Sequence, residues 1–476
     1  EEAIIKMLAQ LDPHSTYSDA EEVKKMNEPL QGNFEGIGVQ FQMIEDTLLV
    51  VQPVSNGPSE KIGILAGDRI IAVNDSAIAG VKMSTEEIMK RLRGPKGSKV
   101  NLKIVRRGVQ DPLVFTVKRD KIPILSLDTS YMIQPKTGYI RINRFGATTA
   151  EEFKKAMKEL QKQGMKDMIL DLQGNGGGYL NAAIDLANEF LGQKELIVYT
   201  EGRTAKRSDF YAKGNGEFRN GRLIVLVDEY TASASEIVSG AVQDWDRGII
   251  VGRRSFGKGL VQRPIDLPDG SMIRLTIARY YTPAGRCIQK PYDSSTDYNK
   301  DLIERFNHGE LMNADSIHFP DSLKVQTKKL GRTVYGGGGI MPDYFVPIDT
   351  TLYTDYHRNL VAKGAVIKFT MKFIEGHRKE LANKYKKFES FNEKFIIDDD
   401  MLATLREMGE KEGVKFNEEQ YQKSLPLIKT QLKALIARDL WDMNEYFRVM
   451  NTTNESVQKA LEILNSEEYQ KKLRAN

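Results

Sequence analysis

Hydrophobic side chains change their spacing along the chain, and each spacing predicts a different kind of element. Residues 1–12 place apolar side chains three and four positions apart until Pro13, which predicts a short amphipathic helix. From about 35 to 120 short alternating runs such as IGVQFQ and TLLVVQPV are separated by glycine and proline turns. Ser84 or Thr85 is placed to begin a helix in this stretch. We therefore expect a compact, mostly β module with an internal helix.

Between about residues 137 and 290 the pattern alternates between strands and helices. Apolar runs such as GYIRI, DMILDL, RLIVLV and MIRLTIARYY are typical of strands, and segments of helical period lie between them. This alternation predicts a layered α/β domain, where we expect the chemistry to take place. Residues 290–350 are rich in Asp, Asn, Gly and Pro, which predicts long loops with little regular structure that wrap the domain.

The chain after about residue 355 is charged and helical in period, which predicts a C-terminal helical appendage. The whole pattern indicates an α/β (α+β) multidomain protein. We expect an N-terminal helical segment at 1–34, the β module at 35–120, the α/β core with its loop-rich extension at 121–350, and the helical region at 351–476. Helical periodicity does not choose between a dimerisation arm that makes an oligomer, an adaptor-docking surface and a cap over a cleft.

The composition removes several classes of function. The chain has 476 residues with 69 Lys and Arg against 65 Asp and Glu, so its charge gives no case for binding nucleic acid or an anionic membrane. The single cysteine, Cys287, excludes an intrachain disulfide and a multi-cysteine zinc cluster. No apolar run approaches the about 18 residues of a transmembrane helix, so we expect no integral membrane segment. The sequence opens with Glu1 and without a basic and apolar signal segment, which leaves the compartment open.

Two glycine-rich loops follow predicted strands and suggest anion sites. GRRSFGKG, from Gly252 to Gly259, has the glycine and lysine spacing of a phosphate loop, but Gly259 stands where a Ser or Thr hydroxyl must hold magnesium. An ATPase is therefore a disfavoured alternative. The second loop, QGNGGGY, lies between a strand and a helix, where backbone N–H groups face an anion. Tyr179 replaces the third glycine of a dinucleotide fingerprint, so an anionic transition state is the favoured occupant.

Ser233 is the candidate nucleophile. The strand RLIVLV runs into DEYTASASEIVSGAV, which places Ser233 at a strand-to-helix turn among small residues that leave room for a substrate backbone. The N–H of Ala234 points at the helix mouth and can stabilise an oxyanion. The alternative is that Ser233 only caps the helix, with Glu236 completing a capping box.

Lys258 is the candidate base. The five histidines, at positions 14, 308, 318, 357 and 377, fall outside the region around Ser233. Lys258 follows the next strand, so one helix and one strand bring it back to Ser233. Burial lowers the pKa of a lysine from about 10.4 toward the range of a useful base. Gln262, four residues on, can orient the ammonium group, whereas the alternative is a solvated surface lysine.

These motifs together resemble the C-terminal processing peptidases, also called tail-specific proteases, a family of serine proteases with a Ser-Lys dyad. The resemblance extends over about residues 1–345. It rests, in this order, on LDPHSTY, EGIGVQF, GILAGDRIIAVN, LRGPKGSKV, DLQGNGGGYL, TASASEI, GRRSFGKGLVQ, RYYTPAGRCIQ and VYGGGGIMPD. It implies that Ser233 is the nucleophile, that Lys258 is the general base and that Gln262 orients the lysine.

The resemblance also implies an oxyanion hole and a fold. The hole uses the N–H groups of Ala234 and of a glycine in the run 176–178, with Gly177 the expected donor. The core is implied to be a crotonase-like spiral of β-β-α units. One departure is visible, because the family usually has Asp-Leu-Arg before the glycines and this chain has Asp171, Leu172 and Gln173. The contacts of that arginine are therefore unassigned.

The β module at 35–120 resembles a PDZ domain inserted into the chain. EGIGVQF resembles the loop and strand that hold a peptide carboxylate, which makes Gly36, Ile37, Gly38 and Val39 the candidate peptide-binding residues. The alternative for GIGV is a simple glycine turn before a strand. Arg93, in RLRGPKG, is the candidate for coupling this module to the catalytic site, and its alternative is a surface arginine.

The sequence thus supports the hypothesis of a serine endopeptidase that cleaves protein substrates near their C termini. Its partners are protein or peptide C-terminal tails, and the reaction needs no metal or organic cofactor. The rival from another class is a non-catalytic PDZ scaffold with a dead hydrolase core. For the compartment, the resemblance suggests the bacterial cell envelope, with a periplasmic location in a Gram-negative cell.

Overall fold

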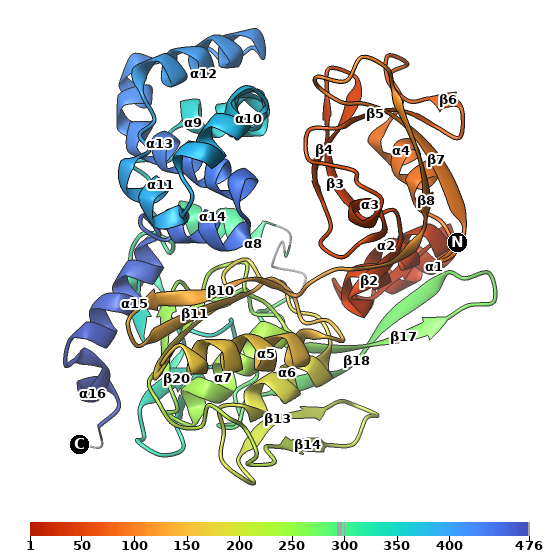
Figure 1. The fold of residues 1–476 in the computed structure, drawn as a ribbon. Helices are drawn as coiled ribbons and strands as arrows, with labels where there is room; N and C mark the ends of the chain where they lie inside the picture. Colours follow the sequence, from red (N-terminus) through yellow and green to blue (C-terminus); the bar gives the residue numbers. More distant parts are fainter. Residues whose placement is uncertain (293–297, 299, 475–476) are drawn as a thin grey trace. The chain divides into compact units, whose positions relative to one another are not determined.

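The computed structural model describes residues 1–292, 298 and 300–474 (Figure 1). The chain forms two compact units. The first unit consists of Glu1–Gly32, Leu125–Asp349 and Asn451–Asn476, and the second consists of Asn33–Ile124 and Thr350–Met450.

The first unit is built on a six-stranded sheet with the order β10-β11-β12-β15-β16-β21. The β10 and β11 pair is antiparallel, and the strands that follow are parallel. Every residue of the central strands is buried, and most of these residues are apolar, as expected for parallel strands covered on both faces. The strands span Leu127–Gln134 (β10), Thr137–Ile142 (β11), Asp167–Asp171 (β12), Leu223–Val227 (β15), Ile249–Gly252 (β16) and Tyr344–Phe345 (β21).

The helices α5 (Thr149–Lys162), α6 (Leu180–Asn188) and α7 (Ala234–Asp244) pack into the core of this unit. In α5 the buried residues Phe153, Met157 and Leu160 follow helical spacing, which gives the helix its apolar face. Every residue of α7 is buried, so this helix is fixed on all sides. Its N-terminus is therefore a rigid place for a reactive group.

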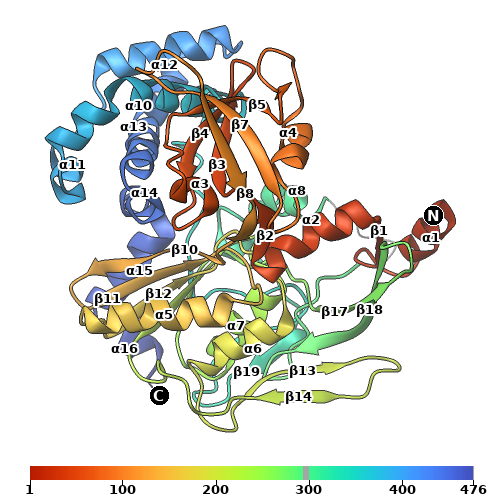
Figure 2. The ribbon, with the colours of Figure 1, turned by 45° about the vertical axis from the view of Figure 1, so that its right-hand side comes forward.

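A second, antiparallel sheet in the first unit brings distant segments together (Figure 2). It has the order β1-β18-β13-β14, and β17 pairs with β18. The pairing of β1 with β18 carries the N-terminal segment, with α1 (Glu2–Ala9) and α2 (Ala20–Gln31), to the part of the chain after Lys258. The strands span Thr16–Ser18 (β1), Leu196–Glu201 (β13), Ser208–Tyr211 (β14), Leu260–Asp266 (β17) and Met272–Tyr281 (β18).

The region 290–350 is more regular than the sequence indicates. It contains α8 (Asp301–Asn307), two short 3₁₀ turns and the hairpin of β19 (Lys324–Gln326) and β20 (Thr333–Tyr335). It also supplies β21 to the central sheet. The prediction of loops with little regular structure is wrong at these places, because strands of two or three residues are too short to show a hydrophobic period.

The end of the chain belongs to the first unit. The C-terminal segment, defined here as residues 451–474, contains α15 (Glu455–Asn465) and α16 (Glu468–Lys472). α15 contacts β15 and β16. Arg222 donates a hydrogen bond of 2.5 Å from Nη1 to the Leu464 carbonyl, and the Leu223 N–H donates to the Tyr469 hydroxyl at 2.9 Å. The segment is therefore held against the central strands β15 and β16, and β15 is the strand that leads to α7.

The second unit contains a β module with the strand order β3-β4-β5-β7-β8. Strand β7 alternates buried and exposed residues, and Ser84 accepts a hydrogen bond from the Glu87 N–H at 3.2 Å to begin α4. β3 lies at an edge of this sheet, and β6 pairs with β5. The elements span β2 (Asn33–Gly36), β3 (Val39–Ile44), β4 (Thr47–Pro53), α3 (Pro58–Lys61), β5 (Arg69–Val73), β6 (Ser76–Ala77), α4 (Thr85–Leu92), β7 (Lys99–Val105), β8 (Leu113–Lys118) and β9 (Asp120–Pro123).

The rest of the second unit is helical. Its core is rich in aromatic residues such as Phe369, Phe391 and Phe395. In the part of the chain that the structure describes, no helix is both long and apolar enough for a membrane crossing. The helices are α9 (Asp355–Ala362), α10 (Ala365–Lys384), α11 (Phe388–Lys394), α12 (Asp399–Lys411), α13 (Glu418–Leu440) and α14 (Met443–Met450).

Candidate active site

A cavity of about 640 Å³ in the first unit brings the sequence-predicted residues together. Its lining includes Ser233, Ala234, Lys258 and Gln262 together with the glycines 176–178. Three segments that are separate in the sequence, namely the glycine loop, the turn at Ser233 and the loop at Lys258, therefore meet at one cavity. The N-terminal segment also reaches this cavity through Met26 and Leu30, and β18 contributes Arg274 and Tyr280.

Ser233 sits at the sharp turn between β15 and α7. Its backbone has φ +57° and ψ −115°, a conformation that a residue with a side chain adopts rarely and at an energetic cost. The surrounding buried elements hold it there. Ala234 is the first residue of α7, so its N–H has no partner within the helix and lies at the positive end of the helix dipole. This turn can therefore present a hydroxyl beside a free amide.

Lys258 also lines the cavity and is held by Gln262, the residue predicted to orient it. Its Nζ donates a hydrogen bond of 3.2 Å to Gln262 Oε1. The Gln262 side-chain amide donates in turn to the His14 carbonyl, which fixes which end of the amide faces the lysine. Burial and the nearby positive charge of Arg274 lower the pKa of Lys258. Both effects favour the neutral amine that a general base requires.

Glu236 joins the serine turn to the lysine loop. Its carboxylate is completely buried and accepts four hydrogen bonds. Oε2 accepts from the N–H groups of Ser233 at 2.8 Å and Lys258 at 2.9 Å, and Oε1 accepts from Ser255 Oγ at 2.5 Å and the Gly257 N–H at 2.7 Å. Burial raises the pKa of Glu236, whereas these donors favour its charged form.

The alternative in which Ser233 only caps α7, with Glu236 completing a capping box, does not describe all the contacts of Glu236, because its carboxylate also binds the lysine loop. The same bonds bear on the phosphate-loop alternative. The N–H groups of Gly257 and Lys258, which a phosphate would need, donate to the Glu236 carboxylate instead. The Gly259 N–H donates to Gln289 Oε1 at 2.8 Å. The loop is therefore folded around side chains of its own protein.

Tyr280 makes a second connection between the two loops. Its buried hydroxyl shares its proton between the carbonyls of Ser233, at 3.0 Å, and Lys258. Burial raises the pKa of this phenol well above its ordinary value, so it remains a donor. No sequence motif signalled this contact, since it depends on how β18 crosses the ends of both loops.

The glycine loop approaches Ser233 closely at Gly177. A side chain there would place its first carbon 2.8 Å from Ser233 Cβ and 2.9 Å from the Ala232 carbonyl, and φ is +99°. Only glycine fits. The Gly177 N–H, the expected second oxyanion donor, forms a hydrogen bond of 2.9 Å with Asn175 Oδ1. The assignment of the Gly177 N–H to the oxyanion hole stays a prediction. Any mechanism that uses this N–H has to account for its hydrogen bond to Asn175.

His14 lies beside Gln262 and Lys258, although its position in the sequence is far from the region around Ser233. Asp12 Oδ1 accepts from the His14 N–H at 2.8 Å to form that turn, and His14 Nε2 shares a hydrogen bond of 2.7 Å with the Tyr298 hydroxyl. Burial and the charge of Lys258 lower the pKa of His14 to about 4, so its ring is neutral near pH 7. The pairing of β1 with β18 causes this proximity, and sequence spacing does not reveal it.

Three parts of the chain match known protein families. Residues 136–296 match the family described as Peptidase family S41, residues 36–121 match the PDZ domain family, and residues 356–442 match a family of unknown function. A carboxy-terminal-processing protease of Bartonella bacilliformis is 40% identical over 296 residues, which cover 61% of this chain and 67% of that protein. A probable CtpA-like serine protease of Staphylococcus aureus is 32% identical over 85% of this chain and 78% of that protein.

The chain belongs to the carboxy-terminal processing proteases of peptidase family S41. It is a serine-type peptidase with a PDZ domain, a mixed α/β protease domain and a helical C-terminal region. Among solved structures, the photosystem II D1 C-terminal processing protease is 28% identical, with a TM-score of 0.39 over 75% of this chain and 83% of that chain. These matches do not assign catalytic roles to individual residues of this chain.

The buried Glu236 carboxylate yields a stability prediction for this peptidase. In Glu236→Gln the amide NH₂ group faces two N–H donors, so buried donors lose their acceptor. We expect the free energy of unfolding to fall by about 2 kcal/mol. Urea denaturation followed by tryptophan fluorescence measures it. Glu159→Gln, at an exposed pair with Lys162, is the control and should change little; equal stabilities of the two variants would show that Glu236 does not hold the loops together.

Proposed function

We propose that the protein is an endopeptidase that cleaves protein substrates near their C termini, with Ser233 as nucleophile and Lys258 as general base. The observation that carries this proposal is the meeting of Ser233, Lys258 and Gln262 in one cavity at the N-terminus of α7. The strained backbone of Ser233 and the lowered pKa of Lys258 agree with the roles of a nucleophile and a base.

The reaction follows from this arrangement. Neutral Lys258 takes the proton of the Ser233 hydroxyl as Oγ attacks the scissile carbonyl carbon, and the carbonyl oxygen becomes an oxyanion. When the C–N bond breaks, the lysine ammonium gives its proton to the departing amine and an ester remains on Ser233. Lys258 then takes a proton from water as the water oxygen attacks the ester carbon. When the ester C–O bond breaks, the lysine ammonium gives this proton to Ser233 Oγ, and the new acid, the free serine and neutral Lys258 remain.

The oxyanion hole requires a change of partner at the glycine loop. The Ala234 N–H is one donor, and we assign the Gly177 N–H as the second. In the structure the Gly177 N–H donates to the side-chain oxygen Oδ1 of Asn175. During the reaction it must therefore leave this oxygen and donate to the oxyanion instead. An exchange of one hydrogen bond for a stronger one to a charged oxygen is favourable when the transition state forms.

The PDZ domain provides the place for the substrate tail. β3 is an edge strand of its sheet, and an extended peptide adds to such an edge as a further strand. The residues Gly36 to Val39 precede and begin this strand, and we assign them the peptide carboxylate. Arg93 lies over the Phe34 ring, 4.7 Å from its centroid, next to this loop. We assign Arg93 the coupling of tail binding to catalysis.

A glycine exchange in the PDZ domain tests tail capture. In Gly38→Ala the added carbon lies 2.9 Å from Ile122 Cδ1 at φ +72°, so the carboxylate loop must shift. We expect the affinity for a tail peptide to fall about tenfold, which corresponds to about 1.4 kcal/mol. Gly63→Ala is the matched control, because Gly63 has φ +87° with nothing within 4 Å. Fluorescence anisotropy with a labelled peptide measures both; an equal loss in both variants contradicts the assignment.

Cleavage of a tailed reporter tests the function. The protein is incubated with an unfolded reporter that carries an apolar C-terminal tail, and the product ends are mapped by mass spectrometry. We expect internal cuts near the tail that disappear when the tail is removed. The rival, a PDZ scaffold with a dead hydrolase core, binds the tail and leaves the reporter intact.

Three further proposals complete this account. The core is related to the crotonase-like spiral, which the β10–β11–α5 unit and the parallel strands after it support.

The protein acts in the bacterial envelope, in the periplasm of a Gram-negative cell, as the family resemblance suggests; cell fractionation tests this. The helical region, residues 351–476, offers one possible surface for an oligomer, and light scattering of the intact protein tests whether an oligomer forms.

A further inference from the structure

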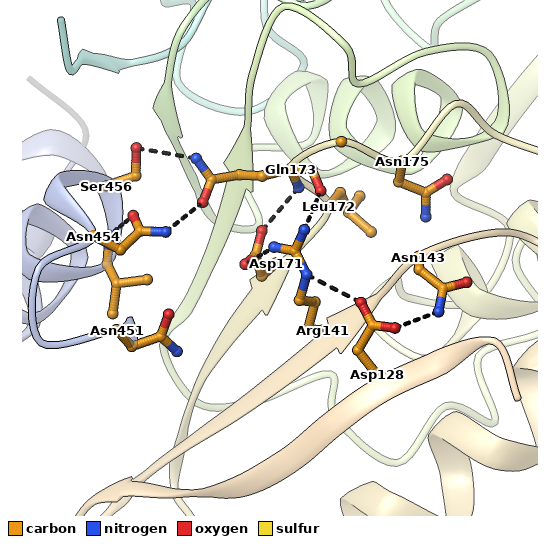
Figure 3. Close-up of polar contacts among 12 residues, drawn as sticks. Asp128, Arg141, Asn143, Asp171, Leu172, Gln173, Asn175, Asn451, Asn454 and Ser456 are labelled. Carbon is orange, nitrogen blue, oxygen red and sulfur yellow. Dashed lines mark hydrogen bonds and ion pairs between the residues drawn. The ribbon is translucent and has the colours of Figure 1, made fainter. Parts of the chain in front are cut away.

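Gln173 lies two residues after the end of β12, at the start of the glycine loop. Its backbone is clamped on both sides (Figure 3). The Gln173 N–H donates to Asp171 Oδ1 at 2.8 Å, and its carbonyl accepts from Arg141 Nη2 at 2.8 Å. The position of this backbone is thus set without the Gln173 side chain.

Arg141 supplies the guanidinium group at this loop. Its Nη1 donates to the completely buried Asp171 carboxylate at 2.5 Å, and its Nε donates to Asp128 Oδ2 at 3.2 Å. Tyr139 donates to the same Asp171 oxygen at 2.5 Å. The negative charge of Asp171 is therefore balanced from β11. The side chain at position 173 is free to make a different contact.

The Gln173 side chain contacts the C-terminal segment (Figure 3). Asn454 Nδ2 donates to Gln173 Oε1 at 3.2 Å, and Gln173 Nε2 donates to Ser456 Oγ at 3.3 Å. Asn454 also caps α15, because its Oδ1 accepts from the Val457 N–H at 3.1 Å. Ser456 is only 2% exposed. Both ends of the Gln173 amide are thus bound to residues that the start of α15 holds in place.

The loop that begins at Gln173 ends against the nucleophile. The Gly174 N–H donates to Asp228 Oδ1 at 2.9 Å. The Asn175 carbonyl accepts from the Ala232 N–H and from Ser235 Oγ, both at 3.0 Å, and Asn175 Oδ1 holds the Gly177 N–H. A chain of hydrogen bonds therefore runs from α15 through the glycine loop to the turn of Ser233.

We propose that Gln173 is a positioning residue that couples the C-terminal segment to the oxyanion loop, with Asn454 and Ser456 as its partners. The coupling to catalysis rests on the proposed function, whereas the coupling to loop order does not. When these bonds are absent, the loop keeps its clamp at Asp171 and Arg141 but loses its outer support. The second oxyanion donor is then less well placed, which slows acylation and leaves substrate binding unchanged.

The C-terminal segment has other anchors, so this coupling can be broken without releasing the segment. Asn451 Nδ2 donates to the Tyr131 hydroxyl at 2.8 Å, and Arg222 and Tyr469 bind the backbone further along. Substitution at position 173 should therefore leave the fold intact. The stability of each variant is checked by its thermal midpoint.

Kinetics of two single variants and their combination test the coupling. Gln173→Met keeps the size of the side chain and removes its polar atoms, and Asn454→Ser keeps a cap for α15 but cannot reach Gln173. We expect each to lower kcat about tenfold with KM within about twofold, and the double variant to lose no more than either alone. Gln173→Glu accepts from both partners and should restore most of the rate. Gln161→Met, which breaks a bond to the Glu217 carbonyl elsewhere in the unit, is the control.

Hydrogen exchange provides a readout that does not need catalysis. We expect the amides of residues 174–178 to exchange faster in Gln173→Met and in Asn454→Ser than in the parent, and to be unchanged in Gln161→Met. Unchanged exchange and unchanged kcat in both variants would overturn the proposal, and so would rate losses that multiply in the double variant. If the parent cleaves no peptide, the proposed function fails while the exchange data still decide whether the loop is held from α15.

Discussion

Replacing Ser233 with alanine is expected to lower peptide cleavage by about 10⁴-fold or more, because the attacking oxygen is removed and only positioning and oxyanion stabilisation remain. Tail binding should stay within about twofold of the parent, since the PDZ domain belongs to the other unit. The measurement is kcat/KM on the tailed reporter, together with the anisotropy of a labelled tail peptide.

The matched control for this variant is Ser239→Ala. Ser239 lies in the same helix, and its buried hydroxyl donates to the Ser235 carbonyl at 2.9 Å without reaching the cavity. Its activity should remain within about twofold of the parent. Normal cleavage by Ser233→Ala would remove the nucleophile from the account, whereas an equal loss in both variants would indicate a damaged α7 instead.

Replacing Lys258 with methionine is expected to lower kcat/KM by about 10³-fold or more, since methionine fills the space but accepts no proton. In the parent, activity should rise with pH as Lys258 loses its proton, because only the neutral amine can act as the base. Burial and Arg274 lower the pKa of this group, so the rise should occur well below the pH at which an exposed lysine titrates.

Arg274 offers a direct probe of this titration. The charged groups that act on Lys258 are Arg274 from β18, Glu236 from α7 and Asp12 from the N-terminal turn, and Arg274 lowers its pKa. In Arg274→Gln that positive charge is gone, so the ammonium form is less disfavoured and the pH profile of kcat/KM should move to higher pH. An unmoved profile would contradict the assignment of Lys258 as the titrating base. A change in KM alone would reflect contact with substrate.

The order of the elements could be predicted from the sequence because the elements are long and regular. β15 is a continuous apolar run, β12 and β16 have apolar residues at their centres or starts, and α5 has a clear helical period. Ser233 and Lys258 could be found for the same reason, since each occupies a loop that follows a well-marked strand. Parallel strands end at one edge, so their loops meet.

The residues that hold Ser233, Lys258 and Gln262 in place could not be predicted, because their contacts join segments that are distant in the sequence. His14 reaches Gln262 through the pairing of β1 with β18, and Tyr280 reaches the two loops through the path of β18. In the sequence, Glu236 is indicated only as a capping-box residue with Ser233. Its hydrogen bonds to the lysine loop depend on tertiary packing, which local sequence does not show. Periodicity likewise identified the helices of the C-terminal segment but not the sheet that they contact.

The most direct test of the account is the reaction of Ser233 with a peptide phosphonate, followed by intact-mass spectrometry and peptide mapping across about pH 5 to about pH 10. The account predicts a single adduct on Ser233, formed at a rate that rises with deprotonation of one base, and at least about 100-fold slower formation in Lys258→Met. An adduct on another residue, or the same rate without the Lys258 amine, would contradict a Ser-Lys dyad in this protein.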